Sequence, residues 1–216
     1  MYYLENFRTN RLVILKLFTK AKERIEMPKE YLLDTNAYYN LLKESREHQK
    51  GNSIFSTEIN MLTSSSLFIS VITKIEIVSV LGKYARGNSG GFQKCTRCIS
   101  KTGDSCQNQW YTRPKARWNR REISGWQKLI QETILGTSPL IKVNVLPFND
   151  KTLKTAEQLI VHALVHNFAS MDAIIAATAQ EAVVIGHDMT VVTSDKGLKA
   201  CLSKANIDCW DAFQAG

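Results

Sequence analysis

Short apolar runs and stretches of helical spacing alternate along most of the chain. The apolar runs predict strands at residues 31–33, 67–71, 141–146, 190–193 and 207–210. The stretches between them predict helices at residues 37–47, 55–62, 73–84, 126–135, 151–167, 171–182 and 196–203. Strands that alternate with helices are typical of a parallel sheet with helices on both faces. The pattern therefore predicts an α/β fold.

Two segments depart from this alternation. Residues 1–30 place apolar side chains among Lys and Arg, which indicates a basic amphipathic helix that Pro28 ends. We favour a helix packed on the flank of the domain over one that binds a membrane or a partner. In residues 85–125 both periods vanish, and such a long irregular run is usually functional or an insertion. We therefore expect an N-terminal helical extension at 1–30 and a domain at 31–212, interrupted by the insertion 85–125.

The basic charge of the chain is local. The net charge is +8, but residues 83–128 alone hold 11 Lys and Arg against 2 acidic residues. The rest of the chain is therefore close to neutral. A basic excess confined to one segment is expected of a patch that contacts a polyanion.

Neither a membrane span nor a secretory signal is expected. No apolar stretch reaches the roughly 20 residues that a span requires. The apolar run at residues 12–18 is short, is interrupted by Lys16 and has no small-residue cleavage site after it. The chain has five cysteines. Without a secretory signal, we expect them to be reduced thiols or metal ligands in a cytoplasmic protein.

Four acidic residues lie at the ends of predicted strands or in the first turns of helices: Asp34, Glu76, Asp172 and Asp195. Each also has a purely structural interpretation. Asp34 could cap the next helix, and Glu76 could complete a capping box with Thr73. Asp172 could interact with a helix dipole, and Asp195 could form a turn. Because ligand sites of open α/β sheets form at the carboxyl ends of strands, we expect the four carboxylates to converge there.

Converging carboxylates would repel one another and raise one another's pKa values. Mg²⁺ or Mn²⁺, which prefer oxygen ligands, would remove this conflict. The metal would activate a water molecule and neutralise charge that builds on a phosphodiester. The predicted metal ligands and catalytic residues are therefore Asp34, Glu76, Asp172 and Asp195.

The acidic motifs, in this order, resemble those of the PIN domain, especially the VapC-like toxins. The resemblance covers about residues 30–212 and rests on strand-Asp34-Thr35-Asn36, Thr73-x-x-Glu76, Asp172-Ala173-x-Ile175-Ala176-Ala177-Thr178-Ala179 and Val192-Thr193-Ser194-Asp195. It implies a three-layer α/β/α fold with a central parallel five-stranded sheet. It also implies a metal-dependent ribonuclease, often a homodimer and often inhibited by an antitoxin. Asn36 and Thr193 match polar positions of the family that would orient ligands or water.

The insertion combines cysteines, tryptophans and basic side chains. Cys95 and Cys98 form a Cys-x-x-Cys pair, and only Cys106 is obvious as a third zinc ligand. Unliganded thiols are therefore favoured, with zinc as the alternative. Arginines among aromatic side chains suit phosphate contacts and base stacking, whereas the alternative is a solvated surface excursion. The predicted nucleic-acid contacts are Arg113, Lys115, Arg117, Arg120 and Arg121.

Other interpretations have less support in the sequence. His162 and His166 are spaced i, i+4, but no third zinc ligand is apparent, so we expect ordinary helix residues. A haloacid-dehalogenase-like phosphatase needs a second acid where Asn36 stands, and a glycine-rich phosphate loop is missing. The main alternative to a ribonuclease is a binding or regulatory protein that keeps the fold without cleavage. The presence of all four acids favours the nuclease.

Overall fold

The computed structural model describes residues 29–86, 91–95, 103, 106–112 and 117–213. The predicted N-terminal extension lies outside these residues, except for its last two positions. Glu30, the second of these, already belongs to the first strand.

The centre of the molecule is a five-stranded sheet with the order β5-β2-β1-β6-β7. All neighbouring strands of this sheet are parallel. The strands are β1 (Glu30–Leu33), β2 (Ser66–Ser70), β5 (Val143–Leu146), β6 (Met189–Val192) and β7 (Cys209–Trp210). Because β1 pairs with β2 on one side and β6 on the other, its carboxyl end lies in the middle of the sheet edge.

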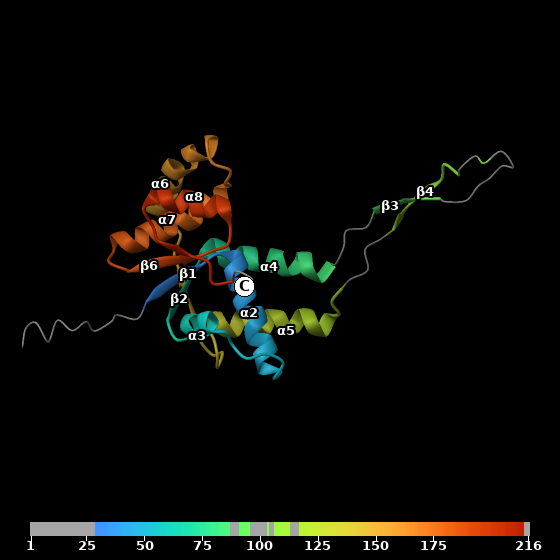
Figure 1. Cartoon of the computed structure of the whole chain (residues 1–216), viewed down its shortest axis with the longest axis horizontal. Helices are drawn as coiled ribbons and strands as arrows, with labels where there is room; N and C mark the ends of the chain where they lie inside the picture. The colour runs from blue at the N-terminus through green and yellow to red at the C-terminus, as the bar shows by residue number, and fades with distance from the viewer. Residues whose placement is uncertain (1–28, 87–90, 96–102, 104–105, 113–116, 214–216) are drawn as a thin grey trace, which may run out of the picture.

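Helices cover both faces of the sheet, so the molecule has three layers (Figure 1). One layer contains α2 (Thr35–Gln49), α3 (Thr57–Thr63), α4 (Val71–Arg86) and α5 (Arg120–Ile134). The other contains α6 (Asp150–Ile160), the 3₁₀ turn η1 (Val161–Leu164), α7 (Ser170–Val184) and α8 (Lys196–Ala205). The predicted α/β/α fold with a parallel five-stranded sheet is confirmed. Within the described ranges, no helix has the length and apolar character needed to cross a membrane.

The strands supply both hydrophobic cores by alternation. In β1, Tyr31 and Leu33 belong to the core under α2, whereas Leu32 belongs to the core under α7. In β6, Val192 joins the first core and Val191 the second. Successive side chains of a strand point to opposite faces, so strands buried on both faces are apolar throughout. This explains why uninterrupted apolar runs identified the strands in the sequence.

The start of α4 differs from the prediction. The helix begins at Val71, directly after β2, rather than at Thr73. The Ser70 hydroxyl accepts a hydrogen bond from the Thr73 backbone N–H (2.9 Å) and thereby satisfies an amide of the first turn. Thr73 is therefore an interior helix residue. The structural interpretation of Glu76 as the partner of Thr73 in a capping box is wrong.

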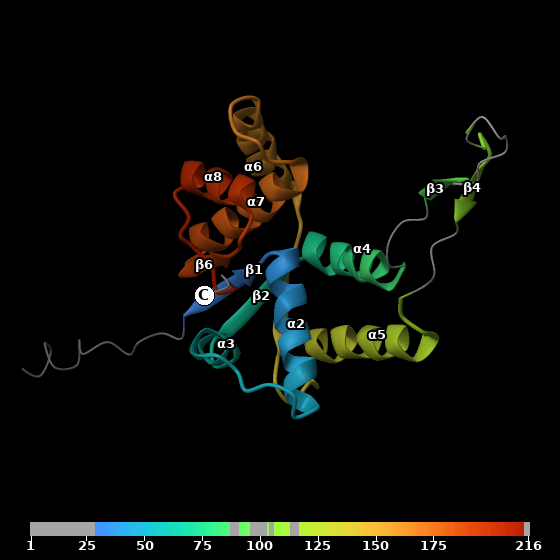
Figure 2. The same ribbon diagram turned by 45° about the vertical axis from the view of Figure 1, so that its right-hand side comes forward.

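The insertion also differs from the prediction. The expectation that regular structure is lost over 85–125 is wrong, because β3 (Gly91–Lys94) and β4 (Gln109–Thr112) form an antiparallel pair. In Figures 1 and 2 this pair lies beyond the outer ends of α4 and α5, away from the three layers. α5 begins at Arg120, where Asn119 and Glu122 form a capping box. The helix was predicted to begin at residue 126, and the Asn-x-x-Glu spacing at 119–122 is the sequence signal that would have placed its start correctly.

The helix predicted at residues 151–167 is shorter in the structure. α6 ends at Ile160, η1 follows, and His166 lies in the loop before α7. His162 lies in the 3₁₀ turn η1, so it is a helix residue but not one of α6. The expectation that His166 is an ordinary helix residue is wrong.

A buried hydrogen bond ties α2 to α5. The Tyr38 hydroxyl is fully buried, 2.5 Å from Thr133 Oγ1. Because Thr133 donates its own proton to the carbonyl of Ile130 (2.8 Å), Tyr38 is the donor to Thr133.

We expect Tyr38→Phe to lower the free energy of unfolding by about 1 kcal/mol in urea denaturation. Tyr84→Phe is the matched control, because Tyr84 is 40% exposed, and it should change stability by less than about 0.5 kcal/mol. Equal losses in both variants would contradict this assignment.

Candidate active site

Asp34 lies at the carboxyl end of the central strand and is 3% exposed. It is the N-cap of α2, and its Oδ1 accepts a hydrogen bond from the Ala37 N–H. Its Oδ2 accepts a second hydrogen bond from the Thr193 hydroxyl. The capping role weighed from the sequence is therefore present, and the same carboxylate also faces the end of β6.

Thr193 connects two of the acids. Its buried hydroxyl donates to Asp34 and accepts a hydrogen bond from the Asp195 backbone N–H (3.0 Å). This one hydroxyl therefore sets both the side chain of Asp34 and the backbone at Asp195. Thr193 matches an orienting residue of the family, and its hydroxyl contacts both Asp34 and Asp195.

The other three acids lie on elements that begin at the same edge of the sheet. Asp195 is exposed and caps α8, with Oδ1 accepting from Leu198 N–H (2.8 Å). Asp172 lies in the first turn of α7 and accepts from Ala169 N–H (2.8 Å) through Oδ2. Glu76 Oε2, on α4, accepts from the Thr35 hydroxyl (2.6 Å).

Within the part of the chain that the structure describes, Asp172, Asp195 and Glu76 each have one carboxylate oxygen without a partner. Among the described residues, Asp172 Oδ1, Asp195 Oδ2 and Glu76 Oε1 accept no hydrogen bond and form no ion pair. In each acid the other oxygen is held by a backbone or hydroxyl donor. Each of these carboxylates is therefore held through one oxygen only.

The charges of the four acids act on one another. Burial raises the pKa of Asp34 from 3.8 to about 6, and the negative charges of Asp195 and Asp172 add to the increase. Hydrogen bonds from Thr193 and Ala37 partly oppose it. The pKa of Asp172 is raised by burial and by the charges of Asp195 and Glu76. These couplings place all four acids in one electrostatic cluster.

The donor set fits a hard divalent cation. Carboxylate and hydroxyl oxygens are the ligands that Mg²⁺ and Mn²⁺ prefer. A cation would offset the burial, and to a smaller extent the repulsion, that raise the pKa values of Asp34 and Asp172. In the part of the chain that the structure describes, no three His, Cys, Asp or Glu side chains are close enough to hold one ion as they lie. A cation at this edge would therefore require the acidic side chains to move closer together.

A polar pocket of about 620 Å³ opens beside Asp195. Asn36, the second predicted orienting residue, is exposed and contributes to its lining. The pocket also contains residues that the sequence analysis did not select: His166, Asn167, Ser194, Lys196, Gly197 and Ala200. The predicted helix through position 167 concealed two of them, because it assigned His166 and Asn167 to a regular helix surface.

The basic and cysteine residues of the insertion are separate from the acids. Arg117, Arg120 and Arg121 are exposed near the start of α5. Figures 1 and 2 show that this end of α5 is remote from the junction of β1 and α2. The other two predicted nucleic-acid contacts, Arg113 and Lys115, lie outside the described residues.

The zinc alternative concerns three cysteines of the insertion. Cys95 and Cys106 are partly buried free thiols. Cys98 lies outside the described residues, so unliganded thiols stay the prediction and zinc stays the alternative.

Comparisons with known proteins identify the family. The model of the PIN domain family matches residues 31–201, most of the chain and all four acids. Among solved structures, the chain is similar to one described as the crystal structure of FitAcB from Neisseria gonorrhoeae. The TM-score is 0.48 at 17% identity, and the match covers 86% of this chain and 99% of that chain. No curated protein sequence matches the chain. The chain therefore belongs to the PIN domain family, whose members are generally nucleases.

Proposed function

We propose that this PIN domain protein is a metal-dependent endoribonuclease that hydrolyses phosphodiester bonds in RNA. The observation that carries the proposal is the electrostatic cluster of acids at the carboxyl edge of the sheet. Asp34 and Asp172 both have raised pKa values, in part because of the charges of the other acids. Perturbed acids at this edge of an α/β sheet are typical of a functional site.

Asp34, Glu76, Asp172 and Asp195 are the proposed metal ligands. Mg²⁺ or Mn²⁺ bound there would supply a Lewis acid that activates water and neutralises charge on the phosphodiester. Asp34 would be held in place by Thr193 and by the first turn of α2. The remaining three acids would bind the cation through the carboxylate oxygen that accepts no hydrogen bond from a described residue.

The substrate and biological role rest on the resemblance to the VapC-like toxins. This resemblance supports RNA as substrate and a role as the toxin of a type II toxin–antitoxin system. Exposed Arg117, Arg120 and Arg121 supply positive charge for RNA contacts. We keep homodimer formation and a cytoplasmic location as predictions.

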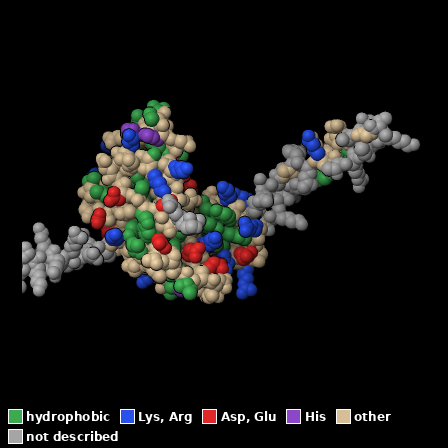
Figure 3. All heavy atoms as spheres, viewed as in Figure 1, with side chains coloured by type: hydrophobic (Ala, Val, Ile, Leu, Met, Phe, Trp, Pro, Cys, Tyr) green, Lys and Arg blue, Asp and Glu red, His purple; other side chains and the backbone are tan. Residues whose placement is uncertain are grey.

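A protein partner, such as an antitoxin, has a suitable surface on this chain. A groove of about 840 Å³, lined mainly by apolar side chains, runs between α4 and α5. Val78 is 56% exposed and Leu135 is 65% exposed in its lining. Figure 3 shows hydrophobic side chains bordered by Lys and Arg over these helices. Exposed apolar surface with a charged border is typical of a protein-binding site.

Asp34→Asn should abolish most of the cleavage. The amide keeps the size of the side chain but removes the charge that would bind the cation, so we expect RNA cleavage to fall by about 100-fold or more. Cleavage would be measured with labelled single-stranded RNA in Mg²⁺ or Mn²⁺. Asp188→Asn is the matched control, because Asp188 is exposed and precedes β6 at the opposite edge of the sheet. Full activity in Asp34→Asn would overturn the assignment. RNA binding without cleavage in the native protein would favour the regulatory alternative.

The same substitution should stabilise the metal-free fold. Asp34 has a folded-state pKa of about 6 against 3.8 when unfolded, so the unfolded state loses its proton first as the pH rises. The free energy of unfolding therefore falls as the pH rises from about 4 to 6, by up to about 3 kcal/mol in total. Above pH 6 this loss no longer changes with pH. In urea denaturation with EDTA, Asp34→Asn should match the native protein near pH 3.5 and exceed it at pH 7. A stability difference that is independent of pH would contradict this.

Binding of metal should be visible without any substrate. A ligand that binds only the folded state stabilises it by about 2.7 kcal/mol at 100 times its dissociation constant. We therefore expect Mn²⁺ to raise the melting temperature of the native protein and of Asp188→Asn. The increase should be much smaller in Asp172→Asn, measured by calorimetry with an EDTA reference. An equal increase in Asp172→Asn would exclude this acid as a ligand.

A further inference from the structure

We propose that the polar pocket beside Asp195 binds a phosphate group of the nucleic acid strand next to the phosphate that is cleaved, with Lys196 as its principal contact. The inference rests on the proposed nuclease function and extends it to the position of the strand. The pocket joins two segments far apart in the chain, the loop before α7 and the first turn of α8. Lys196 and His166 come from these two segments.

Several polar side chains of this pocket have no partner in the part of the chain that the structure describes. Among the described residues, the side chains of Asn36, His166, Asn167 and Lys196 form no hydrogen bond or ion pair. Lys199, one turn further along α8, is by contrast paired with Asp211 at 2.8 Å. Three of these side chains are exposed and that of His166 is partly buried. They can therefore bind a polar ligand in place of water without breaking a contact between described residues.

The backbone around the pocket is closely packed. A Cβ atom at Gly197 would lie only 2.3 Å from the Asn167 carbonyl oxygen and 3.0 Å from Phe168 Cβ. The loop before α7 therefore rests directly on the backbone of α8, which only glycine permits. In this loop the Phe168 N–H donates to the His166 carbonyl (3.0 Å). The two segments that line the pocket are thus held together at a fixed distance.

The chemistry of the lining favours a phosphodiester over a cation. Lys196 carries a positive charge, and Asn36, Asn167 and His166 can all donate hydrogen bonds. These are the groups that contact phosphate and sugar oxygens in nucleic-acid complexes. Among the described residues that line the pocket, Asp195 is the only acid, and Lys196 follows it directly. A strand with one phosphate at the acids would place a neighbouring phosphate at this pocket.

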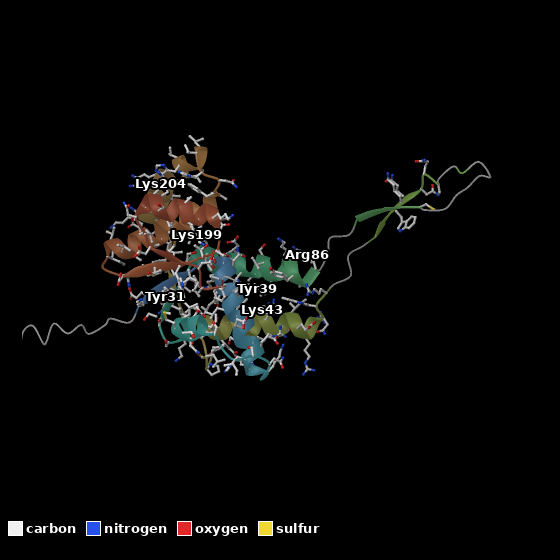
Figure 4. All side chains as sticks on the ribbon, in the orientation of Figure 1. Tyr31, Tyr39, Lys43, Arg86, Lys199 and Lys204 are labelled. Carbon is white, nitrogen blue, oxygen red and sulfur yellow. The ribbon has the colours of Figure 1, made fainter. Side chains whose placement is uncertain are left out.

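The test compares two lysines of the same helix. Lys196→Met removes the proposed contact, and Lys204→Met makes the same change in the last turn of α8. Figure 4 labels Lys204 and Lys199 along this helix. Steady-state cleavage of a single-stranded RNA would be measured with each variant. The same RNA would be tested with neutral methylphosphonates replacing, one at a time, the phosphates flanking the cleaved bond.

For Lys196→Met we expect a KM about 10-fold higher with kcat changed less than 2-fold, as for one charged hydrogen bond lost. The KM difference between Lys196→Met and the native protein should disappear for one RNA, the one whose methylphosphonate replaces the phosphate that Lys196 contacts. Lys196→Arg should restore KM, and Lys204→Met should behave as the native protein. A loss in kcat at constant KM, or a loss that persists with every methylphosphonate, would overturn the proposal.

A second measurement separates this proposal from the nuclease assignment. Binding of the same RNA in EDTA, followed by fluorescence anisotropy, requires no cleavage. Lys196→Met should weaken this binding about 10-fold, and Lys204→Met should not. If the native protein cleaves no RNA but the Lys196 effect on binding is present, the nuclease function fails and the phosphate site stands. If both lysine variants bind as the native protein does, the phosphate site is excluded whatever the cleavage result.

Discussion

Burial of the Asp34 carboxylate is the constraint on which the site depends. It is nearly inaccessible to solvent, at the end of a strand paired on both sides. A charge in that position requires donors from two directions. The first turn of α2 supplies the Ala37 N–H and the end of β6 supplies the Thr193 hydroxyl. These two hydrogen bonds fix the geometry at the carboxyl edge of the sheet.

The same constraint makes the site unfavourable for the fold and suitable for chemistry. The two donors do not compensate for the loss of hydration, so the pKa of Asp34 stays raised, and nearby acids raise it further. A protein selected only for stability would place an uncharged side chain there. Retention of several acids around a buried one favours a ligand that contributes positive charge, because this ligand would stabilise what the fold alone does not.

The sequence was sufficient for the sheet and for the approximate positions of the acids, because both follow from local patterns. Buried parallel strands appear as short apolar runs, and the acids follow them directly. Two of its errors overlooked local caps: Ser70, rather than Thr73, caps α4, and Asn119 with Glu122 caps α5. A third arose where a tertiary contact decides the local structure. Close packing on Gly197 shapes the loop that the helical spacing at His166 concealed. No local pattern reveals such a contact between distant segments.

For Asp34, Asp172 and Asp195, a structural role at the start of a helix and a role as ligand are compatible. A carboxylate has two oxygens, and Asp195 and Asp172 each use one of them for the first turn of their own helix. This use fixes the side chain at the start of the helix, where the backbone N–H groups favour a negative charge. The capping hydrogen bond therefore also determines the position of the second oxygen of each carboxylate. Capping and the proposed metal binding would therefore use different oxygens of one carboxylate, which explains why the sequence alone did not separate the two interpretations.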